Sequence, residues 1–414
     1  MSKIHIAKPA RTSRNQQQIL LLNPLPVKPT ALPKFASAQD MVERLKPSEP
    51  INCLRLHAMR VAARWFVSSF PGQVMYAVKT NPEPIAVKTL HKAGIKHFDV
   101  ASLAEIELVA RECPKAVMHY MHPVKSRESI LQAYARHGVR SFSLDCMDEL
   151  TKIREMTHHA SDLTLYVRLS IPNEHAAYSL QGKFGVAGEE AVELLRAARG
   201  VAGRLGVCFH VGSQCMDPAD YNSAMGRARA IIDEAGVAID SVDVGGGFPS
   251  IYPNLAPPAL SGYMDVIRTA LTEHKFDAME VFCEPGRALV AESGSVVVKV
   301  ELRKGNALYL NDGTYGSLFD AGYPGFVYPV RGIRPHEVMS EETESFRFFG
   351  PTCDSLDSMK GPFLLPADIR EGDWIEIGGL GAYGHTMRTR FNGFHSDKHV
   401  ELLDAPMLSL YGLN

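Results

Sequence analysis

The chain has 414 residues, of which 45% are hydrophobic and 22% charged, and its formal net charge is −2. This composition is typical of a soluble globular protein with length for about two or three domains. The balanced charge argues against nucleic acid or a membrane surface as a partner. No run of about 18 uncharged apolar residues occurs, so no membrane span is expected.

Seven cysteines are scattered along the chain without any CxxC spacing. An odd number of cysteines in a long chain argues against a disulfide framework, and the absence of CxxC pairs argues against a zinc site. We therefore expect reduced thiols, a cytoplasmic protein and no metal site.

The region 1–54 precedes any regular pattern. Residues 3–18 are basic but no apolar core follows them, so they are not a secretory signal. The short apolar segment QQILLLNPL, residues 17–25, is too short for a useful helix. The proline-rich segment 23–34 is expected to be a connector or edge segment. We expect the region 1–54 to contribute strands to a β domain.

Residues 55–292 alternate short apolar runs with amphipathic helical patterns. Eight runs are predicted strands: QVMYAVKT, HFDVAS, AVMHYMHP, SFSLD, LTLYVRLS, GVCFHVGS, SVDVGGG and AMEVFCEPG. A strand followed by a helix, repeated about eight times, is typical of a parallel (β/α)8 barrel or a doubly wound sheet. The count favours a TIM-like barrel, whose active site lies at the carboxyl ends of the strands.

Residues 293–414 have a different pattern. Segments such as GSVVVKVELRKGNALYLNDG and GDWIEIGGLGAY are predicted strands separated by Gly, Asp and Pro turns, with few helical patterns. The sequence thus predicts an α/β protein, in which an all-β sandwich or barrel domain follows the (β/α)8 barrel.

The segment VMYAVKTNPEP, residues 74–84, places Lys79 on the last residues of the first barrel strand. A lysine at a strand end usually extends to solvent. The alternative is an amine in a mostly closed site, where its pKa falls and it becomes a nucleophile. The other strand ends help to decide between these readings.

Two further strand ends carry unusual residues. His210 follows the sixth predicted strand, where a histidine can also be an ordinary core residue. Gly245, Gly246 and Gly247 follow the seventh strand, and three successive glycines allow backbone N–H groups to approach an anion. A tight loop that needs positive φ is the alternative.

The segment CEPGRA ends the last barrel strand, with Glu284 near the barrel mouth and Gly286 and Arg287 as a second anion-binding pair. In the second domain, GPTCDSLD places the thiol of Cys353 beside the carboxylate of Asp354. Pyridoxal phosphate would use all of these parts, because it needs a lysine, an anion-binding loop for its phosphate and a carboxylate at its ring nitrogen.

The chain resembles the fold-type III pyridoxal-phosphate decarboxylases, the group that acts on ornithine, lysine and diaminopimelate. The resemblance runs from about residue 50 to the C-terminus. It is carried by YAVKTN, HVGSQ, DVGGGFP, EPGRALV, NDGTYGS, GPTCDSLD and GAYGHTMRTRFNGF, which occur in the family order. It is strongest to ornithine decarboxylases and to bacterial enzymes that act on both lysine and ornithine.

This resemblance implies residue roles. Lys79 would carry the Schiff base, His210 would stack on the cofactor ring, and Glu284 would pair with its nitrogen. Further cofactor contacts are implied for Asp99, Arg168, Ser213, Gly245, Gly246, Gly247, Gly286, Arg287 and Tyr383, with Glu105 also near the barrel mouth. Cys353 would deliver a proton to the substrate carbon from the partner subunit of a homodimer with shared active sites.

The resemblance also bears on the substrate. Asp354 would hold a terminal ammonium, whereas the diaminopimelate enzymes usually carry Glu there. Asp320 and Tyr315 are further substrate-binding candidates, although the stretch around Asp320 does not align cleanly. We expect decarboxylation of L-ornithine to putrescine and of L-lysine to cadaverine. A diaminopimelate decarboxylase, a fold-type III racemase and an inactive regulator are the alternatives.

Overall fold

The computed structural model describes residues 31–172, 176–178 and 182–413. The chain divides into a unit of residues 1–32 and a unit of residues 33–414, and all elements named below belong to the second. The predictions for residues 3–18 and 17–25, and most of that for 23–34, lie outside the described residues. Among the described residues, no helix combines the length and the apolar character that crossing a membrane requires.

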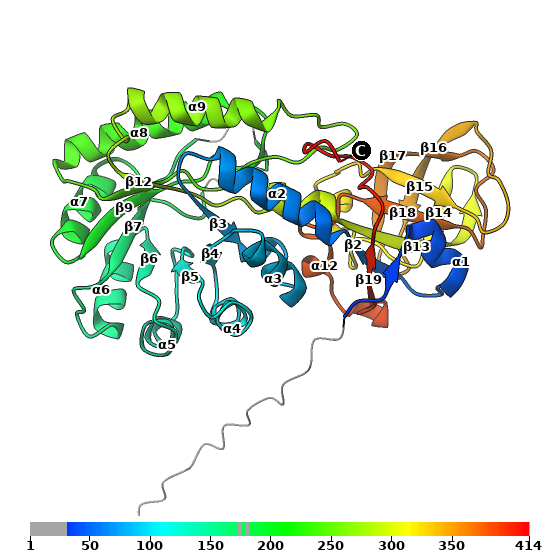
Figure 1. The fold of residues 1–414 in the computed structure, drawn as a ribbon, viewed down its shortest axis with the longest axis horizontal. Coiled ribbons are helices and arrows are strands. Elements are labelled where there is room, and N and C mark those ends of the chain that lie inside the picture. The colour runs from blue at the N-terminus through cyan, green and yellow to red at the C-terminus, as the bar shows by residue number, and fades with distance from the viewer. Residues whose placement is uncertain (1–30, 173–175, 179–181, 414) are drawn as a thin grey trace, which may run out of the picture. The chain divides into compact units, whose positions relative to one another are not determined.

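A closed parallel barrel forms the first half of the fold, as predicted (Figure 1). Its strands follow one another around the barrel in the order β11, β12, β3, β4, β5, β6, β7, β9. Their bounds are β3 Gln73–Ala77, β4 His97–Val100, β5 Val117–Tyr120, β6 Ser141–Leu144, β7 Thr164–Arg168, β9 Arg204–Cys208, β11 Ser241–Asp243 and β12 Glu280–Cys283. Each of the eight predicted runs supplies one strand.

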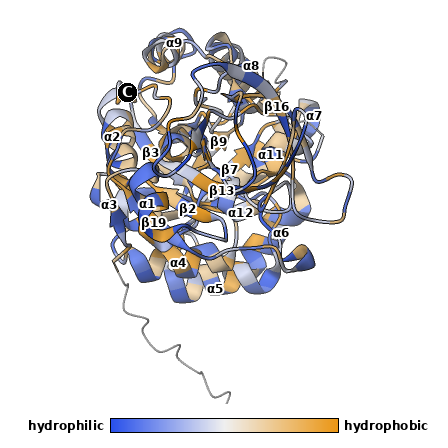
Figure 2. Ribbon diagram, turned by 90° about the vertical axis from the view of Figure 1, so that its right-hand side faces the viewer, coloured by the Kyte–Doolittle hydropathy of each residue, from blue (hydrophilic) through white to orange (hydrophobic). Residues whose placement is uncertain are grey.

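Each predicted helical segment between these strands contains a helix, and together they surround the barrel (Figure 1). Their bounds are α3 Pro84–Lys92, α4 Leu103–Glu112, α5 Arg127–His137, α6 Met147–Met156, α7 Gly188–Arg199, α8 Ala219–Ala235 and α9 Leu260–Glu273. Figure 2 shows hydrophobic and hydrophilic residues mixed along α4, α5 and α6, as amphipathic helices on a barrel require. The side-chain oxygens of Ser102 and Ser126 accept N–H bonds at the starts of α4 and α5.

The second half is built on a nine-stranded sheet, in which β1, β19, β2, β13, β14, β16 and β17 are successive neighbours and β18 joins β13 to β15. The bounds are β1 Lys34–Phe35, β2 Ile51–Leu54, β13 Gly294–Lys304, β14 Ala307–Leu310, β15 Val330–Ile333, β16 Thr343–Phe349, β17 Ser358–Pro366, β18 Trp374–Gly378 and β19 His399–Leu402. Val296 and Val298 of β13 enter one hydrophobic cluster and Val297 enters another, as the two faces of a strand require.

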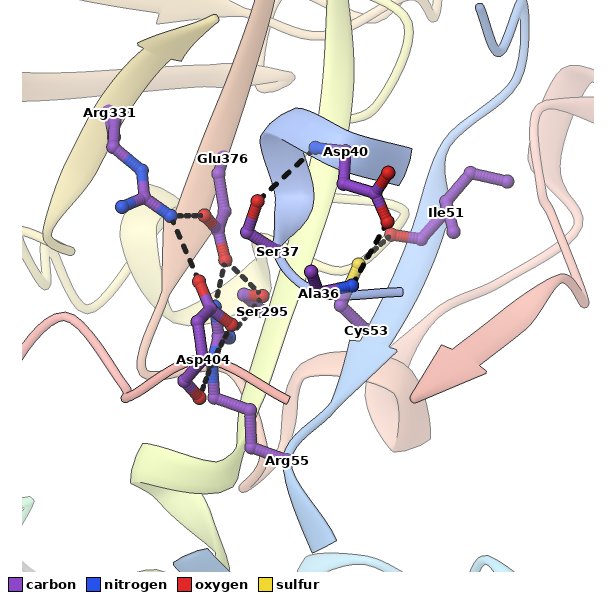
Figure 3. A network of polar contacts seen from close by, with 10 residues as sticks. All are labelled: Ala36, Ser37, Asp40, Ile51, Cys53, Arg55, Ser295, Arg331, Glu376 and Asp404. Carbon is purple, nitrogen blue, oxygen red and sulfur yellow. Dashed lines mark hydrogen bonds and ion pairs between the residues drawn. The ribbon is translucent and has the colours of Figure 1, made fainter. Parts of the chain in front are cut away.

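A buried ionic network lies where the chain leaves this sheet for the barrel (Figure 3). Arg55 directly follows β2, is 1% exposed and donates to Glu376 at 2.8 Å and to Ser295 at 3.0 Å. Its Nη2 also lies 2.9 Å from Asp404, while Arg331 contacts both carboxylates. Two cations and two anions therefore balance one another in this network.

Several elements were not predicted. Helices α1 (Ala38–Leu45) and α2 (Leu56–Ser69) precede the barrel, and a small ribbon pairs β8 (Ala176–Tyr178) with β10 (Ser213–Cys215). The helical spacing of the buried residues Met59, Ala63 and Phe66 could have indicated α2. Lys79 itself lies in a 3-10 turn, η1 (Val78–Thr80), which directly follows the strand on which it was predicted.

Candidate active site

A cavity of about 550 Å3 opens at the carboxyl ends of the barrel strands. Ten of the predicted cofactor-binding residues line it: Lys79, Asp99, Arg168, His210, Ser213, Gly247, Glu284, Gly286, Arg287 and Tyr383. A second hollow lies at the amino ends of β3, β4 and β12, but no lysine lines it. The first cavity is therefore the candidate active site.

Lys79 projects into this cavity, which explains why its side chain is 44% exposed although the turn that carries it is buried. Its Nζ lies 3.2 Å from Oδ2 of Asp99, which lies on the neighbouring strand β4 and pairs with Ala77. Burial lowers the pKa of Lys79, but the carboxylates of Asp99 and Glu284 outweigh this effect and raise it. The predicted fall in this pKa is therefore wrong for the chain alone, because the sequence did not reveal these two neighbours.

Two buried carboxyl groups influence one another, Glu284 in the cavity lining and Asp243 at the end of β11. Burial raises the pKa of Glu284 well above its usual value, and the nearby Asp243 raises it further. Burial likewise raises the pKa of Asp243 to about 6. Oε1 of Glu284 and Oδ2 of Asp243 have no hydrogen-bond partner among the described residues. A cationic N–H group placed here would satisfy Glu284 and favour its ionised form.

His210 is held as a neutral imidazole. The backbone N–H of Gly212 donates to its Nδ1 at 3.0 Å, so this nitrogen is the acceptor and Nε2 carries the hydrogen. Burial, followed by the charges of Arg168 and Lys79, lowers the pKa of His210 well below its usual value. A Cβ on Gly246 would lie 2.9 Å from Nε2 of His210, so this glycine leaves space for the ring.

The other end of the cavity is suited to an anion. Gly247, Gly286 and Ser213 line it, and a Cβ on Gly286 would lie 2.3 Å from Thr80. Arg287 is 5% exposed and its guanidinium lies 5.0 Å from the ring centre of Tyr383. Bare backbone and a buried guanidinium together are typical of a phosphate site. Gly245 and Gly246 shape the loop behind the cavity and are not among its lining residues.

Asp320, a predicted substrate contact, also lines the cavity. Its Oδ2 lies 3.4 Å from Nη2 of Arg287, and Nη1 of the same guanidinium donates to the hydroxyl of Tyr252 at 3.0 Å. Asp320 therefore stands at the anion end of the cavity, where it orients Arg287. Its predicted contact with substrate stays a prediction.

Three more predicted residues do not line the cavity and form a group on the second half of the chain: Tyr315, Cys353 and Asp354. The hydroxyl of Tyr315 donates to Asp354 at 2.5 Å, and the thiol of Cys353 lies 3.4 Å from Oδ1 of Asn392. Cys353 is a free, exposed thiol. One copy of the chain therefore does not bring the predicted proton donor to its own Lys79 cavity.

Sequence reasoning missed several cavity residues. Met121, His122, Lys183 and Phe184 line it from the loops that follow β5 and β7. Asp243 is not among the lining residues but raises the pKa of Glu284, and it could have been found within the DVGGGFP motif as a carboxylate at a strand end. Glu105 is not among the lining residues, because it accepts the N–H of Ala101 at 2.7 Å at the start of α4.

The fold and cavity define a class of protein, the barrel enzymes that bind pyridoxal phosphate through a lysine at a strand end. A family model described as pyridoxal-dependent decarboxylase, pyridoxal binding domain, matches residues 56–291. The chain belongs to this family of pyridoxal-dependent decarboxylases.

Individual relatives agree with this assignment. The chain is 33% identical over 342 residues to the lysine/ornithine decarboxylase of Selenomonas ruminantium, covering 80% of this chain and 84% of the relative. It is 35% identical to the ornithine decarboxylase of Panagrellus redivivus, covering 80% of each. It also resembles the structure of a Vibrio vulnificus lysine/ornithine decarboxylase complexed with putrescine, with a TM-score of 0.74 and 30% identity over 89% of this chain and 99% of that one.

The cavity fits the cofactor of this family. The unpartnered oxygen of Glu284 suits the ring nitrogen, the neutral plane of His210 suits the ring, and Arg287 with Gly247 and Gly286 suits the phosphate. When bound, pyridoxal phosphate supplies an electron sink for the bond that breaks at the α-carbon. Glu284 would hold its ring nitrogen protonated, His210 would fix its plane and Arg287 would anchor its phosphate.

Proposed function

We propose that this enzyme decarboxylates basic L-amino acids, converting L-ornithine to putrescine and L-lysine to cadaverine. The observation that carries the proposal is the convergence of Lys79, Glu284 and Arg287 on one cavity. The relatives named for lysine and ornithine support the substrate class. Loss of CO2 releases an electron pair at the α-carbon, and Glu284 favours the protonated ring that accepts it.

We further propose a homodimer with shared active sites. Cys353 is exposed, Asp354 is half-buried, and neither lines the Lys79 cavity of its own chain, which supports their insertion into the partner subunit's cavity. There the Cys353 thiol would give its proton to the α-carbon, and the Asp354 carboxylate would pair with the distal ammonium of the substrate. An ammonium left unpaired in a closed site would cost several kcal/mol.

Ornithine and lysine differ by one methylene, which a pocket discriminates by only about 1–3 kcal/mol. We therefore propose that both are substrates, as the name of the Selenomonas ruminantium relative suggests. We also propose a cytoplasmic location, which the seven free thiols support.

The test is CO2 release by purified protein with pyridoxal phosphate and, in separate reactions, ornithine, lysine, arginine or meso-diaminopimelate. We expect release from ornithine and lysine, and none with Lys79→Ala. Lys183→Ala is the matched control, because it removes a cavity lysine to which no covalent role is assigned. Release from diaminopimelate alone, or racemisation without CO2, would contradict the proposal.

The shared site has its own test. Lys79→Ala and Cys353→Ala are each expected to be inactive as purified dimers. After random subunit exchange, half of the dimers are mixed and each has one intact site, so about a quarter of the wild-type activity should return. No recovery after exchange would contradict a site built from two subunits.

A further inference from the structure

Three side chains that can bind a metal converge outside the cofactor cavity. Glu83 precedes α3, His385 lies on α12 (Gly384–Met387), and His399 begins β19. One ligand atom from each can be chosen so that all three lie within 4.8 Å of one another. Sequence reasoning did not identify this group, because about 300 residues separate Glu83 from the two histidines.

The histidines are oriented in a way that favours metal binding. Nδ1 of His399 lies 3.0 Å from the carbonyl oxygen of Asp397, which can only accept, so Nδ1 carries the hydrogen. Nε2 of His399 therefore keeps a free electron pair. Histidines that bind a metal usually donate their other ring N–H to a carbonyl or carboxylate oxygen in this manner.

His385 adds a second imidazole. Its Nδ1 lies 3.0 Å from Oε1 of Glu83, and its ring centre is 4.6 Å from that of His399. Its buried Nε2 has no hydrogen-bond partner among the described residues. Two ligand atoms on one tetrahedral zinc ion lie about 3.3 Å apart, so a small outward shift of Glu83 and His385 would admit an ion.

Space for a further ligand lies beside the three side chains. They line a cavity of about 20 Å3, together with Asn52 and Ser317 among others. This is enough for roughly one water molecule. Three protein ligands and a water complete the four-coordinate shell of zinc. One carboxylate and two neutral imidazoles also leave a single negative charge to be balanced by a divalent cation.

We propose that Glu83, His385 and His399 bind one divalent transition-metal ion of the zinc type, with water as the fourth ligand. Imidazole and carboxylate ligands suit zinc, whereas an all-oxygen site would suit magnesium or calcium. The nearby cation Arg388 does not occupy the site, because its guanidinium contacts Asp397 and the carbonyl of Ser396. The proposal runs against the expectation from the cysteines, which did not consider histidines.

The ion would fasten two segments that reach the cofactor cavity. The backbone N–H of Tyr383 donates to the carbonyl of Thr80 at 3.0 Å. Glu83 follows Thr80 by three residues and His385 follows Tyr383 by two. A metal bond between Glu83 and His385 would close a ring around this contact. If the proposed function holds, the metal should therefore slow the loss of pyridoxal phosphate.

The test uses the full chain with bound pyridoxal phosphate, purified without a histidine tag and treated with a chelator. Zn2+ is then titrated, the protein is desalted, and bound zinc is measured by mass spectrometry. We expect one zinc per chain. Glu83→Gln, His385→Asn and His399→Gln should each weaken zinc binding by more than about tenfold. His137→Ala on α5 is the matched control and should bind as the parent does.

X-ray absorption at the zinc edge identifies the ligands. We expect nitrogen and oxygen neighbours at about 2.0–2.1 Å and no sulfur at about 2.3 Å. A sulfur shell would assign the metal to the exposed Cys146 or Cys353 and overturn the proposal. Failure to retain zinc, or equal affinity in the parent and the three ligand variants, would also overturn it. Circular dichroism of each variant shows that it is folded. Zinc binding is measured apart from CO2 release, so either proposal can fail alone.

Discussion

The network around Arg55 predicts that the loss of stability caused by replacing Arg55 depends strongly on whether Glu376 is replaced as well (Figure 3). Replacing Arg55 with Met leaves Glu376, which is fully buried, with Arg331 as its remaining cation. Removal of one member of a buried ion pair typically costs about 3–5 kcal/mol. Because Arg331 stays within 2.6 Å of Glu376, we expect the lower end, about 3 kcal/mol.

Glu376→Leu should cost a similar amount, because Asp404, whose side chain is 22% exposed, is then the one carboxylate left to Arg55 in the network. The double variant removes one charge of each sign and leaves Arg331 and Asp404, 3.4 Å apart, as a pair. It should cost about 1–2 kcal/mol, mainly for the lost hydrogen bonds of Ser295. The coupling between the two substitutions is then about 4–5 kcal/mol.

Urea unfolding at fixed protein concentration measures these free energies. The two tryptophans of the chain report on both sides of the network, since Trp65 lies in α2 and Trp374 begins β18. Arg331→Ala is a control, because this side chain is 49% exposed and its removal should cost less than that of Arg55. If the free energy of unfolding falls in the double variant by the sum of its falls in the two single variants, the charge-balance argument is refuted.

Three more predictions follow from the site and its surroundings. Glu284→Gln should lower kcat by at least about 100-fold, because a neutral amide does not hold the ring nitrogen protonated. Pyridoxal phosphate should still bind to this variant. An unchanged kcat would contradict the prediction. Arg287→Ala should weaken binding of the cofactor by about 1.5–3 kcal/mol, which equilibrium dialysis measures, and Arg287→Lys should restore part of it. Burial raises the pKa of Glu292 from 4.5 to about 7, so the folded state binds the extra proton and stability should fall as pH rises through this range. Urea titrations between about pH 4.5 and 7 should show a smaller decrease in the free energy of unfolding with pH for Glu292→Gln. An unchanged pH dependence would assign the decrease to another group.

The barrel could be predicted from the sequence because its strands are buried on both faces and read as short apolar runs between amphipathic helices. The strand ends then identified Lys79, His210, Glu284 and Arg287 as members of one cavity. What the sequence could not provide was the neighbour of each group. Asp99 reverses the expected shift in the Lys79 pKa, although it lies on the next strand and twenty residues away.

The other site residues could not be predicted correctly because they lie in loops or in segments distant in the sequence. Lys183 and Phe184 enter the cavity from an irregular segment whose path no periodicity specifies. Cys353 shows the opposite problem, since its motif was clear in the sequence but its place is outside the cavity of its own chain. The carboxylate of Glu105 serves the start of a helix, a local role that its position near the barrel mouth concealed.

The connection of β2 to the sheet also has a consequence during synthesis of the chain. In Figure 1, β2 lies between β13 and β19, and both of these partners are made later than β2. β2 ends at Leu54, whereas β13 begins at Gly294. At about 5–20 residues per second, tens of seconds pass before the ribosome delivers the first partner. During this time Ile51–Leu54 is an unpaired apolar edge, while the barrel sequence that follows can already begin to fold. The chain should therefore depend on chaperones early in translation and be most prone to aggregate when translation stops before β13.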